Sequence, residues 1–346
     1  MKPNLVFTWL GSKLPWYTIQ SLYLNLRYSC SRIHLVTDEA NITYLLRFHS
    51  QLVSQIALIP IDSFYNQPHN LSAKNYYGDL GYRDGFWLRT FERFYVLDSL
   101  LSSRTLTTFF HAELDNICFG LDRLQTYLDS LSFSSFFVQD NITRGVLSLA
   151  YLKGPASLRR LLSFLESLPP DHKFNDMHDL GAFLQTRSNG TAALPNESAL
   201  LAKPQWNHLP LSTVHGVCDA NAIGQYLLGL DYRITRRLTN LFKNENLFIN
   251  LHHVNFVLSK HDFNTDQHSI MNPLPALVYK PTGQVIPIYN IHVHSKSFIW
   301  LSSPPLMRIL FTLVNLRIAI PILSISMLRY RLTRFLYSLS GAKSKV

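Results

Sequence analysis

Phe109-Phe110-His111-Ala112-Glu113-Leu114-Asp115-Asn116 is the stretch that says most about the fold and chemistry of this chain. The Thr- and Phe-rich residues 105–110 predict a buried strand, which leads directly into polar side chains that are costly to desolvate unless paired or metal-bound. In an extended backbone Glu113 and Asp115 share one face, and a divalent cation would relieve their repulsion. Oxygen ligands suit Mg²⁺ or Mn²⁺. The alternative is that both acids cap the following turn and pair with arginines.

The chain before this stretch alternates between strand and helix patterns. Strand patterns occur at 4–10, 32–38 and 56–60, and helical spacing occurs at 14–26 and 43–50. This order predicts an α/β fold with a mainly parallel, Rossmann-type sheet flanked by helices. Ligands bind such sheets at the carboxyl ends of the strands, where the polar stretch lies.

The remainder of the chain continues the mixed pattern. We predict helices at 87–101, 121–131, 156–168 and 222–228, strands at 135–139 and within 284–294, and loops at 65–85 and 185–200. No GxGxxG or P-loop motif is present.

Tyr289-Asn290-Ile291-His292-Val293-His294-Ser295-Lys296 is the second informative segment. In an extended chain His292, His294 and Lys296 face the same way. Imidazole can complete a Mn²⁺ shell, and a lysine ammonium can bind phosphate as a point charge. The alternative is a polar strand face with ordinary surface histidines.

Taken together, these two segments resemble the GT-A glycosyltransferases, whose DxD motif binds Mn²⁺ and the donor diphosphate. In that resemblance, which spans about residues 4–300, Glu113-Leu114-Asp115 stands for DxD. His292 or His294 stands for the late histidine of the metal shell, and Lys296 for a lysine that touches the diphosphate. Glu replaces the first Asp, so Asp115 is the firmer metal ligand, and Glu113 contacts ribose or reaches the metal through water.

The resemblance also implies contacts with the nucleotide-sugar. In the family the first strand ends at the base and ribose, the second strand ends near the base, and a basic residue before the motif steadies the acids or the sugar. The corresponding donor-binding candidates are Thr8, Trp9, Leu10, Asp38, Arg83, Arg89, Arg93, Glu113 and Lys296. For each arginine the alternative is a surface or helix salt bridge.

Three further aspartates are catalytic candidates. Asn175-Asp176-Met177-His178-Asp179 resembles the loop and helix that carry acceptor or sugar contacts in such enzymes, so Asp176 or Asp179 would bind donor-sugar hydroxyls. The alternative is a helix cap. Asp219 either caps the helix at 222–228 or lines the acceptor cleft.

Composition excludes several classes of protein. Charged residues make up 16% and aromatic residues 13% of the chain, the reverse of a disordered sequence. Cys30, Cys118 and Cys218 lie far apart without a CxxC pair, which excludes a disulfide scaffold or cysteine zinc site. Asp266 is the last acidic residue, and the lysines and arginines after it carry most of the net charge of +10. A near-neutral body with a basic C-terminal segment is not the pattern of a nucleic-acid binder.

The C-terminal segment begins after a break at Pro304-Pro305. The apolar run from Ile309 to Leu328 almost reaches the length of a bilayer span, but Arg317 lies at its centre. We therefore expect a basic amphipathic helical extension that lies on an anionic cytoplasmic leaflet. The alternatives are a buried helix pair of the core and an oligomer contact.

These observations lead to one hypothesis for the whole chain. Residues 1–300 form a catalytic domain (1–120 nucleotide-binding, 121–300 acceptor-binding), and 301–346 form the membrane-associating extension. Apolar residues 5–10 are too few for a signal peptide, so a cytoplasmic, peripheral location on the inner face of the membrane is expected.

By resemblance, the chain is a Mn²⁺- or Mg²⁺-dependent, retaining glycosyltransferase that uses a UDP-sugar rather than a GDP-sugar. Its acceptor is a glycan or lipid-linked hydroxyl, in surface polysaccharide or lipopolysaccharide assembly. The alternative is a catalytically degenerate binding or scaffold protein at the membrane.

Overall fold

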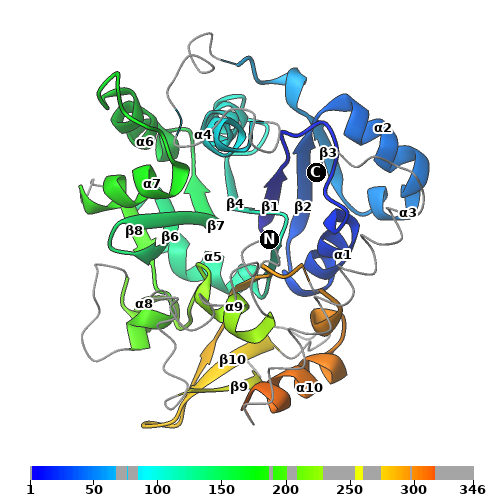
Figure 1. The fold of residues 1–346 in the computed structure, drawn as a ribbon, viewed down its shortest axis with the longest axis vertical. Coiled ribbons are helices and arrows are strands. Elements are labelled where there is room, and N and C mark those ends of the chain that lie inside the picture. Colours follow the sequence, from blue (N-terminus) through cyan, green and yellow to red (C-terminus); the bar gives the residue numbers. More distant parts are fainter. Residues whose placement is uncertain are drawn as a thin grey trace.

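The computed structural model describes residues 2–67, 76, 85–186, 190–200, 209–228, 254–259, 274–296 and 298–315. Its centre is a seven-stranded sheet in the order β3-β2-β1-β4-β7-β6-β8 (Figure 1). These strands are β1 (Asn4–Thr8), β2 (Arg32–Thr37), β3 (Ala57–Pro60), β4 (Thr108–Ala112), β6 (Ser135–Asn141), β7 (Arg144–Lys153) and β8 (Thr191–Leu194).

The sheet is mostly parallel, as the sequence predicts. β3, β2, β1 and β4 run parallel to one another, and β6 runs parallel to β8. Only β7 is antiparallel to its neighbours β4 and β6. The carboxyl ends of β1, β4, β6 and β8 therefore meet at one edge of the sheet, and the α/β fold class with a mixed, helix-flanked sheet is confirmed.

Helices cover both faces of the sheet because each presents an apolar stripe to it. One face packs against α1 (Thr18–Tyr28), α2 (Glu39–Phe48), α3 (Ser50–Val53) and α5 (Leu121–Asp129). The other face packs against α4 (Phe86–Ser102), α6 (Ala156–Glu166) and α7 (Asp176–Gln185). Figure 1 shows these two groups on opposite sides of the strands.

A third apolar core lies below the large sheet in Figure 1. It joins α1 and β5 (Asn116–Cys118) to a three-stranded antiparallel sheet, two helices and a short 3₁₀ turn. These elements are β9 (Val254–Ser259), β10 (Leu274–Tyr279), β11 (Gln284–Pro287), α9 (Ala222–Leu228), η4 (Phe298–Leu301) and α10 (Pro304–Asn315). Other short elements of the described chain are η1 (Ile61–Ser63), η2 (Glu197–Leu200) and α8 (Leu211–Val214).

A two-stranded ladder connects this third core to the large sheet. β5 (Asn116–Cys118) follows β4 after a tight turn, and β12 (Asn290–His292) pairs with it in antiparallel register. Asn116 lies opposite His292, and Cys118 lies opposite Asn290. The ladder therefore brings residues separated by most of the chain to the edge where β4 ends.

Two predictions about local structure are wrong or incomplete. Residues 185–200 are not simply a loop, because Thr191–Leu194 form β8 and pair with β6; the sequence Thr-Ala-Ala-Leu is too short and too low in β-branched residues to show a strand pattern. β7 was not predicted at all. Its residues are almost all buried, so its apolar side chains do not alternate with polar ones.

The predicted C-terminal extension is described only as far as Asn315, and the remainder of 301–346 lies outside the described residues. The described part forms α10, whose buried side packs on the third core. In the portion of the chain that the structure covers, no helix is both long and apolar enough to cross a membrane.

Candidate active site

Glu113 and Asp115 lie in the turn that joins β4 to β5. The Asn116 amide donates to the Glu113 carbonyl at 2.9 Å, so the backbone folds back here instead of staying extended. Phe7 of β1 lies beside Ala112, which places this turn next to the carboxyl end of β1. The sequence pattern predicted that both acids would share one face of an extended strand. In the structure a turn brings them together instead.

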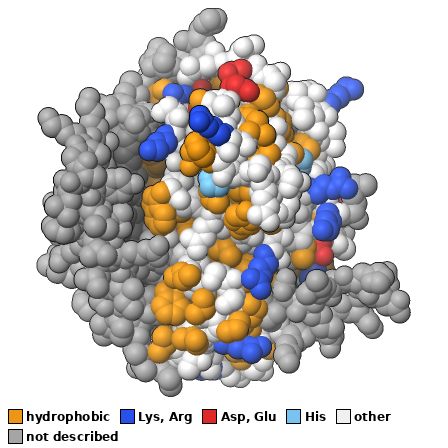
Figure 2. Space-filling model, turned by 90° about the vertical axis from the view of Figure 1, so that its right-hand side faces the viewer, with side chains coloured by type: hydrophobic (Ala, Val, Ile, Leu, Met, Phe, Trp, Pro, Cys, Tyr) orange, Lys and Arg blue, Asp and Glu red, His pale blue; other side chains and the backbone are white. Residues whose placement is uncertain are grey.

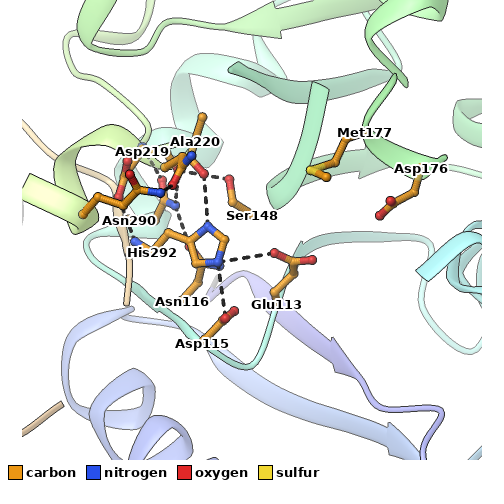
Figure 3. Close-up of polar contacts among 12 residues, drawn as sticks. Glu113, Asp115, Asn116, Ser148, Asp176, Met177, Asp219, Ala220, Asn290 and His292 are labelled. Atoms are coloured by element: carbon orange, nitrogen blue, oxygen red, sulfur yellow. Dashed lines mark hydrogen bonds and ion pairs between the residues drawn. The ribbon is translucent and has the colours of Figure 1, made fainter. Parts of the chain in front are cut away.

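His292 reaches the same place from the far end of the sequence. It ends β12, directly opposite Asn116, and the next amide, that of Val293, donates to the Asp115 carbonyl at 2.7 Å. His292 Nε2 lies 3.3 Å from Asp115 Oδ2 and 3.7 Å from Glu113 Oε2 (Figure 3). One ligand atom from each of these three residues lies within 4.8 Å of the others, an arrangement that can hold a metal ion.

The orientation of the His292 ring is fixed by its other nitrogen. Nδ1 lies 3.0 Å from the Ala220 carbonyl, which accepts only if Nδ1 carries a proton, so Nε2 is left to face the acids. Burial disfavours the charged ring, but the Asp115 carboxylate outweighs burial and raises the pKa of His292 to about 9. A bound cation would displace this proton, as metal binding to imidazole requires.

Asp219 holds the backbone beneath His292. It is fully buried, and its carboxylate accepts from the amides of Ile223 at 3.0 Å, Gly224 at 2.8 Å and His292 at 2.9 Å. Burial raises the pKa of Asp219 to about 6, although these amides oppose the shift. Of the two roles left open, the structure favours capping of α9 over lining a cleft.

Asparagine side chains extend this buried support. Asn290 Nδ2 donates to the Asp219 carbonyl at 2.9 Å and to Asn116 Oδ1 at 2.8 Å. Asn25 of α1 donates to the Asn116 carbonyl and accepts from the Cys118 amide, both at 2.9 Å. These contacts fix both strands of the β5–β12 ladder. Sequence reasoning missed them, because an isolated asparagine gives no indication of a distant backbone partner.

Two cations neutralise the acidic turn. Arg93 of α4 donates to Glu113 Oε1 at 2.7 Å and to Asp176 Oδ2 at 3.2 Å. The Lys296 ammonium contacts Asp115 Oδ2 and lies 5.2 Å from the centre of the Tyr17 ring. Burial opposes ionisation of Asp115, but Lys296 and then His292 hold its pKa well below the usual range. Asp115 thus remains charged, and neighbouring cations set the positions of both acids.

The position of His294 differs from the predicted one, in which His292, His294 and Lys296 share one face of an extended strand. β12 ends at His292, and a turn follows in which Lys296 adopts a left-handed φ of 56°. The His294 ring lies against the His292 ring, with centroids 4.0 Å apart, and its Nε2 is buried without a hydrogen-bond partner. Burial, and then the charge of His292, holds the pKa of His294 well below its usual range. Of the two histidines, His292 is therefore the one that faces the acids.

The predicted nucleotide-binding residues lie at the ends of β1 and β2. Thr8 ends β1, and its hydroxyl is buried without a hydrogen-bond partner among the described residues. The Trp9 indole donates to the Lys13 carbonyl at 2.9 Å, and Leu10 packs against an apolar core. Asp38 caps α2, since its carboxylate accepts from the Asn41 amide at 2.7 Å.

The three candidate arginines have different positions. Arg93 contacts Glu113, whereas Arg89 is half exposed and pairs with Glu92 on its own helix at 2.9 Å. Arg83 lies outside the described residues.

Asp176 and Asp179 both belong to the first turn of α7. Asp176 is buried beside Arg93, and burial raises its pKa to about 6 although Arg93 opposes the shift. Figure 3 shows Asp176 and Met177 beyond Glu113, on the side away from His292. Asp179 instead accepts from the Asn175 amide at 2.9 Å and contacts His172 at 2.8 Å, so it serves the start of its helix.

Comparison with known proteins finds no match in sequence and several in structure. No family model and no curated protein matches the chain. Among solved structures, mouse xyloside xylosyltransferase 1 in its apo form is similar at 9% identity and a TM-score of 0.39, over 56% of this chain and 86% of that one. Apo GlyE, a glycosyltransferase of Streptococcus pneumoniae TIGR4, is similar at 14% identity and a TM-score of 0.36, over 56% and 45%.

Galactosyltransferase LgtC, solved with donor and acceptor sugar analogues, is similar at 11% identity and a TM-score of 0.35, over 56% of this chain and 74% of that one. The similar structures thus include glycosyltransferases, the class that the sequence resembles. The chain spans less than half of GlyE. At this distance the function is argued from the site itself.

Proposed function

We propose that this protein is a metal-dependent glycosyltransferase that moves a sugar from a nucleotide-sugar to an acceptor hydroxyl. The observation that carries the proposal is the convergence of Glu113, Asp115 and His292 at the carboxyl edge of the sheet. In α/β sheets this edge is where nucleotides and their phosphates bind. The resemblance of Glu113-Leu114-Asp115 and the late histidine to the motifs of the GT-A enzymes also supports the proposal.

The residues at this point fit a divalent ion. Two carboxylates and one imidazole are a suitable donor set for Mn²⁺, and the tethered Nδ1 of His292 leaves Nε2 as the ligand atom. Glu113, Asp115 and His292 would hold the ion. When bound, it would supply positive charge to the diphosphate that departs in the reaction.

Lys296 is suited to bind the same diphosphate. Its ammonium lies beside Asp115, so any phosphate next to that carboxylate would be within its reach. A lysine ammonium at a departing diphosphate stabilises charge that develops in the transition state. Arg93 has a different role, because its contacts with Glu113 and Asp176 position two acids at once.

A retaining reaction suits the described acids better than an inverting one. An inverting transfer needs an accessible carboxylate base at the acceptor hydroxyl. In the described part of the site, Asp219 is buried among amides and Asp179 is engaged at the start of α7. Asp176 remains, and its place next to Arg93 and Glu113 suits a hydroxyl of the donor sugar.

The finer features of the reaction follow from resemblance. We propose UDP rather than GDP as the donor nucleotide, with Thr8 at the end of β1 as a contact for base or ribose. The acceptor is a glycan or lipid-linked hydroxyl in the assembly of a surface polysaccharide or lipopolysaccharide. The basic C-terminal segment, which would hold the enzyme on the inner membrane surface, supports a lipid-linked acceptor.

Thermal shift with UDP-, GDP- and CMP-sugars, with and without Mn²⁺, tests the donor site, because a ligand that binds the native state raises its apparent stability. We expect a Mn²⁺-dependent shift with UDP-sugars and slow release of UDP with water or an acceptor. Asp115→Ala should abolish both, and Asp171→Ala, which removes an exposed aspartate outside the site, should abolish neither. Equal shifts for the wild type and Asp115→Ala would refute the proposal.

One observation favours a second candidate, a degenerate scaffold. Arg93 and Lys296 already neutralise Glu113 and Asp115, so the acidic turn is balanced without a metal. A scaffold would keep its fold and its partner with these pairs intact and would bind no donor. Absence of any Mn²⁺-dependent shift, together with unaltered folding of the wild type, would favour this candidate.

A further inference from the structure

Large hydrophobic side chains that face solvent gather on one side of the molecule. Among the described residues they include Trp16 before α1, Tyr23 on α1, Ile299 in η4 and Ile309 on α10. Trp16 is 69% exposed, Ile299 48% and Ile309 50%. We call these four residues the apolar face. Exposed apolar groups in such a cluster mark an interaction surface more often than scattered single residues do.

Direct contacts join the elements that carry the apolar face. The Trp16 ring lies edge-on to Tyr17 with centroids 5.7 Å apart, and Tyr17 stacks on Phe298 of η4 at the same distance. Arg27 of α1 donates to the Ser302 carbonyl at 2.9 Å, just before α10. η4 contacts both α1 and α10, and all three elements contribute to one apolar core. The elements that carry the four side chains thus pack directly against one another.

The charge around the apolar face is positive. Arg27 and Arg308 are exposed on α1 and α10, and α1, η4 and α10 contain no aspartate or glutamate. Figure 2 shows hydrophobic side chains running down this side of the molecule, with lysine and arginine side chains around them. Tryptophan, tyrosine and arginine are the residues that settle at the headgroup level of a bilayer.

A second set of exposed side chains extends the surface toward α2. Tyr44, Leu46 and Phe48 are exposed there, and the Arg47 guanidinium lies 5.1 Å from the centre of the Phe48 ring. Figure 1 shows α2 and α1 on the same side of the large sheet. The combination of aromatic and aliphatic groups with arginine is therefore repeated on the neighbouring helix.

We propose that the apolar face docks the folded domain onto an anionic lipid membrane. Insertion of the four side chains among lipid headgroups would bury apolar area, while Arg27 and Arg308 would meet lipid phosphates. The chain that follows α10 supports a lipid occupant over a protein one, because it contains arginines and lysines among apolar residues and no acid. The proposal is independent of the chemistry of the metal-capable site.

Vesicle co-sedimentation of the full chain tests this docking. The vesicles are pure phosphatidylcholine or phosphatidylcholine with phosphatidylglycerol, and the variants are Trp16→Ala and the pair Ile299→Ser with Ile309→Ser. A matched control is Ile142→Ser, because Ile142 is 52% exposed on the turn between β6 and β7, away from the apolar face. A further variant replaces Arg329, Arg331 and Arg334 by glutamine, to measure the part of the affinity that belongs to the C-terminal segment.

We expect the wild type and Ile142→Ser to bind the anionic vesicles equally. Each apolar-face variant should bind on the order of tenfold more weakly, because it buries less apolar surface. Unaltered binding by both apolar-face variants, with binding lost only in the arginine variant, would overturn the proposal. So would a wild type that does not bind vesicles but forms a dimer that Trp16→Ala dissociates, since a second copy would then cover this face. Circular dichroism checks that each variant is folded.

Discussion

Asp115 and Asp219 are two aspartates beneath the same histidine, and they are held in opposite ways. Asp115 contacts the side chains of Lys296 and His292, and of these only the Lys296 ammonium is free to swing away, because the Ala220 carbonyl holds the His292 ring. Asp219 accepts from the backbone amides of Ile223, Gly224 and His292, which cannot leave without unfolding α9 or β12. Their pKa values diverge accordingly: that of Asp115 is held well below the usual range, and that of Asp219 is raised to about 6.

The difference separates a ligand-binding acid from a structural one. A carboxylate that is paired with a mobile ammonium can exchange this partner for a metal or a phosphate-bound metal. A carboxylate that accepts from backbone amides through both oxygens holds the backbone in place, and neither oxygen is available to bind a metal. Spacing in the sequence does not reveal this distinction, because both aspartates simply precede a polar or small residue near a predicted element end.

The largest effect on stability should come from removing Asp219. Asp219→Ala leaves three buried amides without an acceptor, so the free energy of unfolding should fall by about 3–5 kcal/mol. Urea unfolding monitored by circular dichroism measures it, with Asp171→Ala as the control that should change stability little. A loss below about 1 kcal/mol would mean that the amides find other acceptors and that Asp219 does not hold the site.

Gly224→Ala should weaken the same contact between α9 and β12, at the amide that donates to Asp219. A Cβ at this position would collide with the His292 carbonyl and lie 2.9 Å from Asp219 Oδ2, so α9 would have to move away from β12. We expect a loss of about 1–3 kcal/mol, as in other overpacked cores, together with weaker Mn²⁺ binding. Isothermal titration would detect the second effect. Mn²⁺ affinity equal to the wild type in a destabilised variant would show that His292 does not depend on α9 for its position.

Glu197 is a third kind of acid, because its carboxylate is paired neither with side-chain cations nor with backbone amides of the described residues. It is buried, both its carboxylate oxygens lack hydrogen bonds, and burial, then the charge of Asp219, raises its pKa well above the usual 4.5. A carboxyl group whose pKa is raised in the folded state makes its full contribution to stability only below the unfolded pKa of about 4.5. This contribution of Glu197 is lost as the pH rises through the pKa of the folded state.

Glu197→Gln should therefore leave stability at pH 4 nearly unchanged and raise it at pH 8 relative to the wild type, because the amide carries no charge that burial would penalise. Urea unfolding across this pH range measures the difference. If the free energy of unfolding changed with pH in the same way for both proteins, Glu197 would not be a buried carboxyl group with a raised pKa.

Lys296→Met should have the smallest effect of these variants. It removes the ammonium that contacts Asp115 and competes with a metal for this carboxylate. Without the ammonium, Asp115 is free to bind a cation, so the affinity for Mn²⁺ in the absence of donor should rise by about threefold to tenfold, as expected for one competing charge. The affinity for a UDP-sugar in the presence of Mn²⁺ should fall. Weaker Mn²⁺ binding in the absence of donor would show that Lys296 supports the metal ligands instead of competing with the metal.

Much of the framework could be predicted from sequence because it depends on local patterns. The end of β4 and the α4 and α9 helices follow from periodicity and strand-end chemistry. The convergence of the two distant polar segments was expected only from the resemblance to the GT-A enzymes. β7 was missed because a strand buried on both faces loses the alternation that identifies strands.

The choice between His292 and His294 depended on a turn that sequence does not specify. An extended chain would present both rings to the acids, but β12 ends at His292 and the left-handed Lys296 changes the direction of the chain. The asparagine contacts between Asn25, Asn116 and Asn290 were equally hidden, because they depend on tertiary register and not on spacing.

Pulsed electron paramagnetic resonance of Mn²⁺ bound to the full chain tests whether Glu113, Asp115 and His292 form a metal site. We expect bound Mn²⁺ with coupling to one imidazole nitrogen, lost in His292→Gln and retained in His294→Gln. Asp115→Ala should give only the spectrum of free Mn²⁺. Nitrogen coupling that survives His292→Gln, or a wild type that shows free Mn²⁺ alone, would contradict the assignment of Glu113, Asp115 and His292 as a metal site.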